Sequence, residues 1–228
     1  TYIGSLYYLG LRVQPLGLGK TDEGNVVVAG LLAEGGYDGR AFGVGLGAGI
    51  SSVNGDMDYI LDVMNDSPPY AGYESTQPPE KSWDQRTQHA FTLSQQARLG
   101  ARDGLNFTLN NLLLYHSDDT GSKNESGFIY GGTFARLTIP VGIDTDLLLE
   151  GGGGMMGYRY GSVGVFSWLV GNGAEGSLGL SVSAGGAGVS GSRKVTITQS
   201  VGTKSHYLED VDINGPMVSA GVKYRFGI

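Results

Sequence analysis

Apolar residues alternate with small or polar residues along most of the chain. Between Phe42 and Ile50 every second residue is apolar, and every residue between them is glycine. Residues 178–185 and 218–226 show the same period of two. Because successive side chains of a β-strand point to opposite faces, this alternation predicts strands that each have one apolar face.

We predict ten such strands, at residues 4–14, 25–35, 40–52, 86–101, 104–116, 127–139, 146–158, 162–171, 175–190 and 213–226. Most of them have the roughly nine to eleven residues that a tilted strand needs to cross a bilayer. The pattern is least regular in the seventh and eighth strands, where residues 151–154 are all glycine and residues 158–162 are predicted to form a turn. The apolar parity changes between Leu109 and Leu112, which predicts a β-bulge at residues 110–111.

The connections between the predicted strands alternate in length. The short ones are at residues 35–39, 102–104, 140–145 and 172–174. The others are mostly long and polar, at residues 15–24, 53–85, 117–126 and the distal part of 191–214. Transmembrane barrels have short turns at one end and long loops at the other. We therefore predict an all-β, closed antiparallel up-and-down transmembrane barrel of ten strands (eight is the alternative), forming one domain over residues 1–228.

The last predicted strand, residues 218–226, alternates regularly and carries two aromatic residues at its end, Tyr224 and Phe226. It resembles the C-terminal strand of bacterial outer-membrane β-barrel proteins, in which these aromatic positions serve as an insertion signal. In this chain Gly227 and Ile228 follow the aromatic residue. The resemblance implies a Gram-negative outer membrane with both termini in the periplasm. It also implies contact with membrane lipid, lipopolysaccharide and the barrel assembly machinery.

Composition sets further bounds on the chain. It has 228 residues, no cysteine and a formal net charge of −7. The length suits a single all-β domain, and no apolar run approaches the roughly 20 residues of a membrane helix. The absence of cysteine excludes disulfides and thiolate metal sites, and the negative charge disfavours a nucleic-acid partner. Because Thr1 opens directly into a strand-like pattern, we expect a mature chain without its signal peptide.

The residues that alternate with the apolar set are expected to face the interior of the barrel. Besides many glycines and serines, this set contains a possible lumen charge cluster: Arg12, Arg98, Arg136, Glu150, Lys223 and Arg225. An unpaired charge in a narrow lumen is costly, so we expect Glu150 to pair with Arg136 on the neighbouring strand. A lumen sealed by salt bridges is the favoured prediction. A narrow constriction that repels cations is the alternative.

Four glycines of the third predicted strand fall on its interior face: Gly43, Gly45, Gly47 and Gly49. Glycine permits the tight curvature of a small barrel. The missing side chains could instead leave room for a folded-in loop or a partner's peptide. We expect curvature to be the reason.

The sequence offers little specific chemistry. Residues 152–157 match the dinucleotide-binding string, but a strand pattern follows them where that motif requires a helix. His89 with Ser82 or Asp84 is the one grouping that could serve a lipid-modifying hydrolase, and its spacing is unspecific. The acidic residues of the segment 53–85 could bind Ca²⁺, but they do not follow the calcium-loop pattern. We predict no catalytic residue, cofactor or metal site.

The favoured function is therefore a non-catalytic anchor or partner-binding component of the cell envelope. A partner could bind through the external loops or the lumen. Residues 194–201 and 206–213 alternate on either side of Gly202, so they are expected to extend the last two strands as a hairpin that could bind by strand addition. The alternatives are a narrow, porin-like channel and a lipid-modifying hydrolase. The channel would have to be narrow because ten strands are too few for a general diffusion pore.

Overall fold

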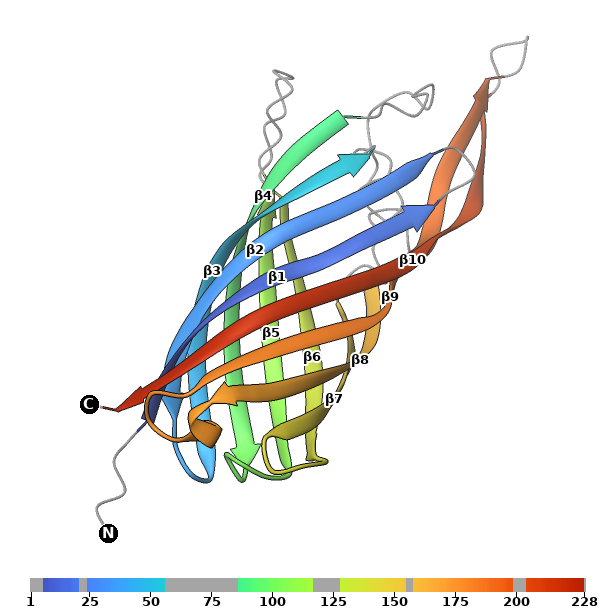
Figure 1. Ribbon diagram of the computed structural model, residues 1–228. Coiled ribbons are helices and arrows are strands. Elements are labelled where there is room, and N and C mark those ends of the chain that lie inside the picture. Colours follow the sequence, from blue (N-terminus) through green and yellow to red (C-terminus); the bar gives the residue numbers. More distant parts are fainter. Residues whose placement is uncertain are drawn as a thin grey trace.

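The computed structural model describes residues 6–20, 24–55, 86–116, 128–154, 158–198 and 204–227. These residues form one closed antiparallel barrel, in which each strand pairs with its neighbours in sequence and the last strand pairs with the first (Figure 1). The strands are β1 (Leu6–Lys20), β2 (Asn25–Asp38), β3 (Phe42–Gly55), β4 (Arg86–Gly100), β5 (Asn106–His116), β6 (Phe128–Pro140), β7 (Thr145–Gly154), β8 (Tyr158–Val170), β9 (Leu178–Thr198) and β10 (Lys204–Gly227). The prediction of ten strands in an up-and-down barrel is confirmed. Closure removes the free sheet edges that would otherwise expose unpaired backbone groups.

The two faces of the sheet differ in chemistry as the alternation predicts. On β3, for example, Val44, Leu46 and Ile50 lie on the outside and are exposed, whereas the glycines between them face the interior. Most of the large exposed hydrophobic side chains belong to this outer face of the strands. Within the described residues, no helix is both long and apolar enough to cross a membrane.

Aromatic side chains form a group on the outer face at the end of the barrel where both chain termini lie (Figure 1). The ring of Tyr7 lies 5.8 Å from that of Tyr37 and 6.0 Å from that of Phe226, and the rings of Tyr37 and Phe42 are 5.4 Å apart. Tyr224 stacks on Phe226 at 6.3 Å. Aromatic girdles mark the levels at which a membrane barrel meets the lipid headgroups. The two aromatic residues of the C-terminal strand therefore belong to such a girdle.

Short turns connect the strands at this same end. They comprise residues 39–41, 101–105 and 141–144 and the segment 171–177, which contains a short 3-10 helix, η2 (Gly171–Gly173). Asn172 adopts a left-handed conformation within that helix, with φ of 50°, as asparagine does more readily than most residues. The predicted short connections therefore all lie at one end of the barrel, as the alternation of their lengths indicates.

Three local predictions are wrong. β1 does not end before Pro15 but continues to Lys20, because a register shift between Val13 and Leu16 accommodates the proline and pairing resumes beyond it. Residues 158–162 form the start of β8 rather than a turn. The predicted bulge at residues 110–111 is absent, and pairing continues there without a register shift. The apolar pattern changes because Asn111 is a polar residue on the outer face and Leu112 an apolar residue on the inner face.

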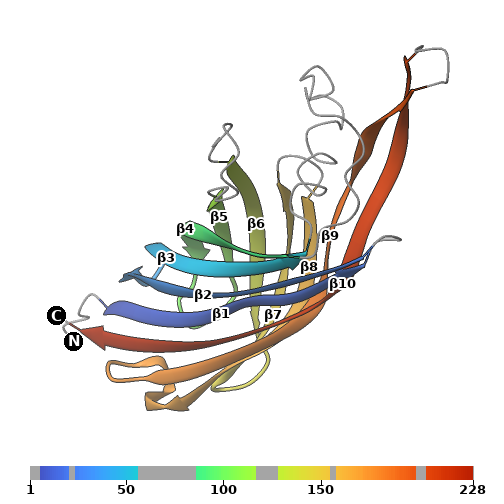
Figure 2. The same ribbon diagram turned by 90° about the horizontal axis from the view of Figure 1, so that it is seen from above.

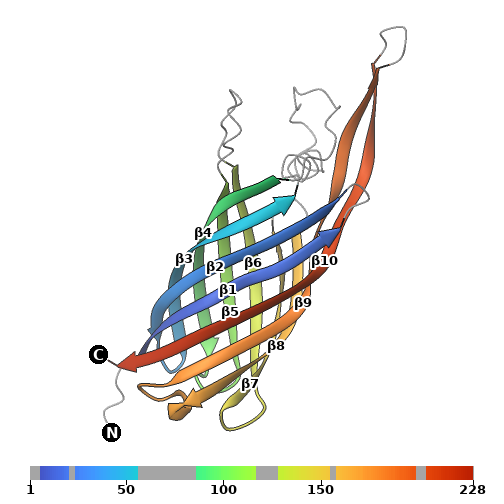
Figure 3. The same ribbon diagram turned by 45° about the horizontal axis from the view of Figure 1, so that its top comes forward.

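β9 and β10 are the longest strands of the described chain and extend past the rest of the barrel. Figures 2 and 3 show them projecting beyond the rim at the end opposite the termini. His206 lies opposite Thr196 and Ile213 opposite Val189, so the expected extension of these two strands as a hairpin is confirmed.

Candidate functional site in the barrel lumen

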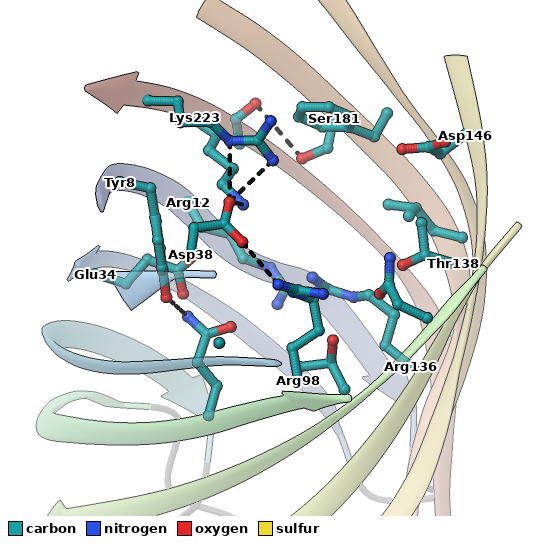
Figure 4. A pocket seen from close by; sticks show the side chains of 18 of the residues that line it. Tyr8, Arg12, Glu34, Asp38, Arg98, Arg136, Thr138, Asp146, Ser181 and Lys223 are labelled. Carbon is teal, nitrogen blue, oxygen red and sulfur yellow. Dashed lines mark hydrogen bonds and ion pairs between the residues drawn. The ribbon is translucent and has the colours of Figure 1, made fainter. Parts of the chain in front are cut away.

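The carboxylate of Asp38, at the end of β2, lies at the centre of a charge network near the end of the lumen that holds the termini. Arg225 approaches it to 2.9 Å and Lys223 to 3.1 Å, both from β10. Arg98 of β4 approaches the other carboxylate oxygen to 3.2 Å (Figure 4). Asp38 and Arg225 are each only 2% exposed, so this cluster is shielded from bulk water. Three strands are thereby joined across the lumen by one acidic side chain.

Arg225 extends the network to the turns. Its guanidinium donates to the Asp103 carboxylate at 2.8 Å and to the carbonyl oxygen of Gly173. The same group lies over the Trp168 ring, 4.5 Å from its centroid, in a cation–π contact. All of these partners lie at the end of the barrel that carries the short turns. The network therefore links β10 to the short turns across this end of the lumen.

A second charged group lies further along the lumen and is centred on Glu150 of β7. The expected ion pair with Arg136 of the neighbouring β6 is present at 3.0 Å. Arg12 of β1 reaches the same carboxylate oxygen at 3.3 Å from a strand that is not adjacent. The contact between Arg12 and Glu150 therefore spans the lumen. The two arginines compensate the charge of the buried carboxylate and occupy the lumen at a second level.

An apolar cluster occupies the lumen beyond these charges. Met217 is 1% exposed and packs with Phe134 and Tyr160, against which Leu112 and Ala187 also pack. The rings of Phe134 and Tyr160 meet edge-on with centroids 5.5 Å apart, a favoured aromatic geometry. These side chains come from five different strands. The cluster occupies the lumen at a third level, with apolar side chains in place of charged ones.

A cavity lies between the charged side chains of the lumen. It has a volume of about 140 Å³ and is lined by both charged groups and by Tyr8, whose hydroxyl accepts a hydrogen bond from Gln96. Such a volume holds a few water molecules.

The glycines of β3 lie where neighbouring groups come close. A side chain at Gly45 would overlap the hydroxyl of Tyr8, and one at Gly47 would overlap the hydroxyl of Ser94. At Gly49 the obstacle is the backbone of β2 at Leu31. The space beside these glycines is thus occupied by this chain's own side chains and backbone, as tight curvature and a filled lumen require.

The six charged residues singled out in the sequence all face the lumen, but they divide into two groups. Arg12, Arg136 and Glu150 form one of them, and Arg98, Lys223 and Arg225 surround Asp38 in the other. Sequence reasoning missed Asp38 and Asp103. The alternation could have identified Asp38, because it follows Leu32 and Glu34 at even-numbered, inward-facing positions of β2. The predicted turn at residues 35–39 includes Asp38, which is why the alternation was not applied to it.

Among the described residues, the candidate hydrolase and Ca²⁺-binding residues outside the lumen do not form a site. His89 is exposed on the outer face of β4. Ser82, Asp84 and the acidic segment that was considered for Ca²⁺ lie outside the described residues, apart from the first few residues of that segment. No group of three or more potential metal ligands occurs among the residues that the structure covers.

A polar cluster lies on the outer face at the base of the projecting hairpin. Arg159 donates to the carboxylate of Asp212 at 2.8 Å and to the side-chain oxygen of Asn214 at 2.9 Å. Ser190 donates to the same carboxylate at 2.7 Å. The hydrogen bonds from Ser190 and Asn214 lower the pKa of Asp212 below its ordinary value, because they stabilise the ionised form. Below this cluster, the outward residues of β10 become apolar at Val218, so the cluster lies beyond the apolar surface.

The outer surface, the aromatic girdle and the closed sheet together define a class. A ten-stranded antiparallel barrel with lipid-compatible side chains outside and polar groups inside has the architecture of bacterial outer-membrane β-barrel proteins.

No known family model matches the sequence, and neither does any curated protein. Among solved structures, similarity is found to the translocator domain of the autotransporter NalP from Neisseria meningitidis, with 13% identity, a TM-score of 0.36 and coverage of 99% of this chain and 90% of that one. The outer membrane protease OmpT from Escherichia coli is similar with 11% identity, a TM-score of 0.35 and coverage of 98% and 94%. A FadL homologue from Pseudomonas aeruginosa has 7% identity, a TM-score of 0.34 and coverage of 97% and 90%. Similarities at this level carry no information about function.

Proposed function

We propose that this chain is an integral outer-membrane β-barrel that does not conduct and does not catalyse, and that serves as an anchor or partner-binding component of the cell envelope. Its termini and short turns lie in the periplasm, and the β9–β10 hairpin projects from the cell surface. This orientation rests on the general rule that short turns of such barrels face the periplasm.

Side chains that occupy the lumen at three successive levels support the proposal. The charged groups around Asp38 and Glu150 are held by ion pairs of 2.9 to 3.3 Å, and the third level is the apolar cluster around Met217. Opening a passage would separate buried charges from their partners, which is strongly unfavourable. A barrel of this kind offers a rigid wall and a projecting hairpin rather than a pore.

The projecting hairpin supports a role in partner binding. Its backbone continues the sheet past the rim, where a partner's strand can add to an exposed edge. The polar cluster of Arg159, Asp212 and Asn214 fixes the base of the hairpin to β8. The hairpin is therefore held at a defined place relative to the membrane surface.

Conductance tests the closed lumen directly. The purified full-length chain, inserted into planar lipid bilayers, is expected to show no stable conductance above that of the bare membrane. A porin inserted into the same membranes provides the positive control, and a heat-sensitive shift in unboiled detergent electrophoresis shows that the barrel is folded. A large and stable conductance of the unmodified protein would contradict the proposal and favour a narrow channel. A change in the lipid A mass spectrum that depends on the protein would contradict its non-catalytic part.

A further inference from the structure

Three polar side chains interrupt the apolar outer face of the barrel. Gln95 of β4, Asn111 of β5 and Thr133 of β6 are all exposed on this face. They form one continuous row, because Gln95 lies directly opposite Asn111 and Asn111 lies directly opposite Thr133. We call Gln95, Asn111 and Thr133 the polar row.

The polar row lies in the middle of the membrane-facing surface rather than at its edge. The outward residues of β5 other than Asn111 are all apolar or aromatic, in the order Phe107, Leu109, Leu113 and Tyr115. Eight residue steps separate Phe107 from Tyr115, or about 27 Å along the strand at about 3.4 Å per residue. Asn111 is halfway between these two aromatic ends, at the depth where lipid tails surround a barrel.

The neighbouring strand shows the same arrangement. On β4, Phe91 and Leu93 lie on the outer face on one side of Gln95, and Leu99 lies on the other side. These three hydrophobic residues are exposed, at 45% to 64% of their surface. The amide groups of two adjacent strands are therefore enclosed above and below by hydrocarbon.

The hydrogen bonds of the polar row are only partly satisfied within the chain. The Thr133 hydroxyl donates to the Asn111 side-chain oxygen at 2.8 Å. Within the described part of the chain, no hydrogen bond is recorded for the Gln95 amide or for the Asn111 side-chain nitrogen. Lipid tails offer neither donors nor acceptors, so polar groups left unpaired at this depth are unfavourable. A single Gln95–Asn111 hydrogen bond would still leave three of the four side-chain N–H groups of the two amides unpaired.

We propose that the polar row is the centre of a homodimer interface, in which the β4–β6 wall of one copy faces the same wall of a second copy. A second copy fits this surface because the polar row is self-complementary. Side-chain amides carry both donors and acceptors, and a two-fold axis brings each amide of one copy against an amide of the other. Leu93, Leu109 and Leu113 around the row pack against their counterparts in the same arrangement.

Cysteine cross-linking tests the interface, because the native chain contains no cysteine. In the full-length protein, reconstituted into phosphatidylethanolamine–phosphatidylglycerol vesicles, Leu93→Cys and Leu109→Cys are each expected to give a disulfide-linked dimer on mild oxidation. Val182→Cys on β9 is the matched control, since it is outward, apolar and more exposed than either leucine but lies on the far wall. It is expected to remain monomeric.

A second variant tests the polar row itself. Gln95→Leu combined with Asn111→Leu continues the apolar face, so the barrel is expected to fold and to keep its heat-sensitive electrophoretic shift. The loss of the intermolecular hydrogen bonds is expected to weaken dimerisation about ten-fold or more, measured as molar mass in detergent over a concentration series.

Several results would overturn the homodimer. They are a monomeric native protein at all concentrations, equal cross-linking at Val182, or a dimer that persists unchanged in the double leucine variant. Cross-linking of the leucine positions to a different membrane protein would overturn it as well. Because these readouts do not depend on the lumen, the homodimer and the closed, non-conducting barrel can fail independently.

Discussion

At the scale of single residues, Asp38 has a role that no other carboxylate in the described chain shares. Arg98, Lys223 and Arg225 all direct their positive charges at it. A buried charged group is strongly destabilising when it has no oppositely charged partner. Removing Asp38 therefore leaves three cations in a confined space without their common counter-ion.

The variant Asp38→Asn is expected to lower the free energy of unfolding by about 3–5 kcal/mol, the usual effect of removing one partner of a buried ion pair. Asp103→Asn is the control, because the Asp103 side chain also contacts Arg225 but is 48% exposed, and about 1 kcal/mol or less is expected there. Urea unfolding in lipid vesicles, followed by the electrophoretic shift, measures both. Equal effects of the two substitutions would show that Asp38 does not organise the network.

At the scale of elements, the pairing of β2 with β3 depends on the absence of side chains on the inner face of β3. Gly49 lies opposite Leu32, and a Cβ atom there would overlap the carbonyl oxygen of Leu31 and come within 2.9 Å of the Leu32 Cα atom. Backbone atoms of a paired strand cannot move aside as the end of a flexible side chain can. Gly161 of β8 offers the contrast, since the nearest atom to an added Cβ is 4.0 Å away.

The substitution Gly49→Ala is therefore expected to destabilise the barrel by about 1–3 kcal/mol, the range for overpacking in a filled interior. Gly161→Ala is expected to be neutral or to stabilise the barrel by up to about 1 kcal/mol, because alanine loses less conformational entropy than glycine on folding. The same urea titration compares the two variants. A neutral Gly49→Ala would mean that β2 and β3 can separate without loss.

The strands could be predicted from the sequence, but most of the contacts between side chains in the lumen could not. Alternation is a local property, so all ten strands could be located from it. Pro15 was misleading because a register shift accommodates it, and the expected turn at residues 158–162 and bulge at residues 110–111 are absent because pairing continues through both. The pair of Arg136 and Glu150 could be predicted because a short turn joins their strands. Arg12 is 138 residues from Glu150, and Arg225 is 187 residues from Asp38. Those contacts depend on how the sheet closes, which alternation does not specify.

At the scale of the whole molecule, the orientation in the membrane can be tested with intact cells. Protease added from outside is expected to cut within residues 56–85, a polar segment with several prolines, because such connections are preferred cleavage sites. The turn at residues 39–41 is expected to remain intact. An epitope placed after Ile228 should bind its antibody only once the outer membrane has been opened. Binding of the antibody to intact cells would reverse the orientation.

The pairing of β1 with β10 means that β1 gains its second neighbour only after β10, the last strand of the barrel in sequence order, has been synthesised. Until then the backbone edge of Leu6–Lys20 is open to pairing with other chains, so we expect the unfolded protein to aggregate unless it is protected before closure. The contacts of Asp38 with Lys223 and Arg225 form only after this step, because both cations belong to the last strand. A chain truncated before residue 218 would lack both cations and much of the closing strand, so its barrel is expected not to close.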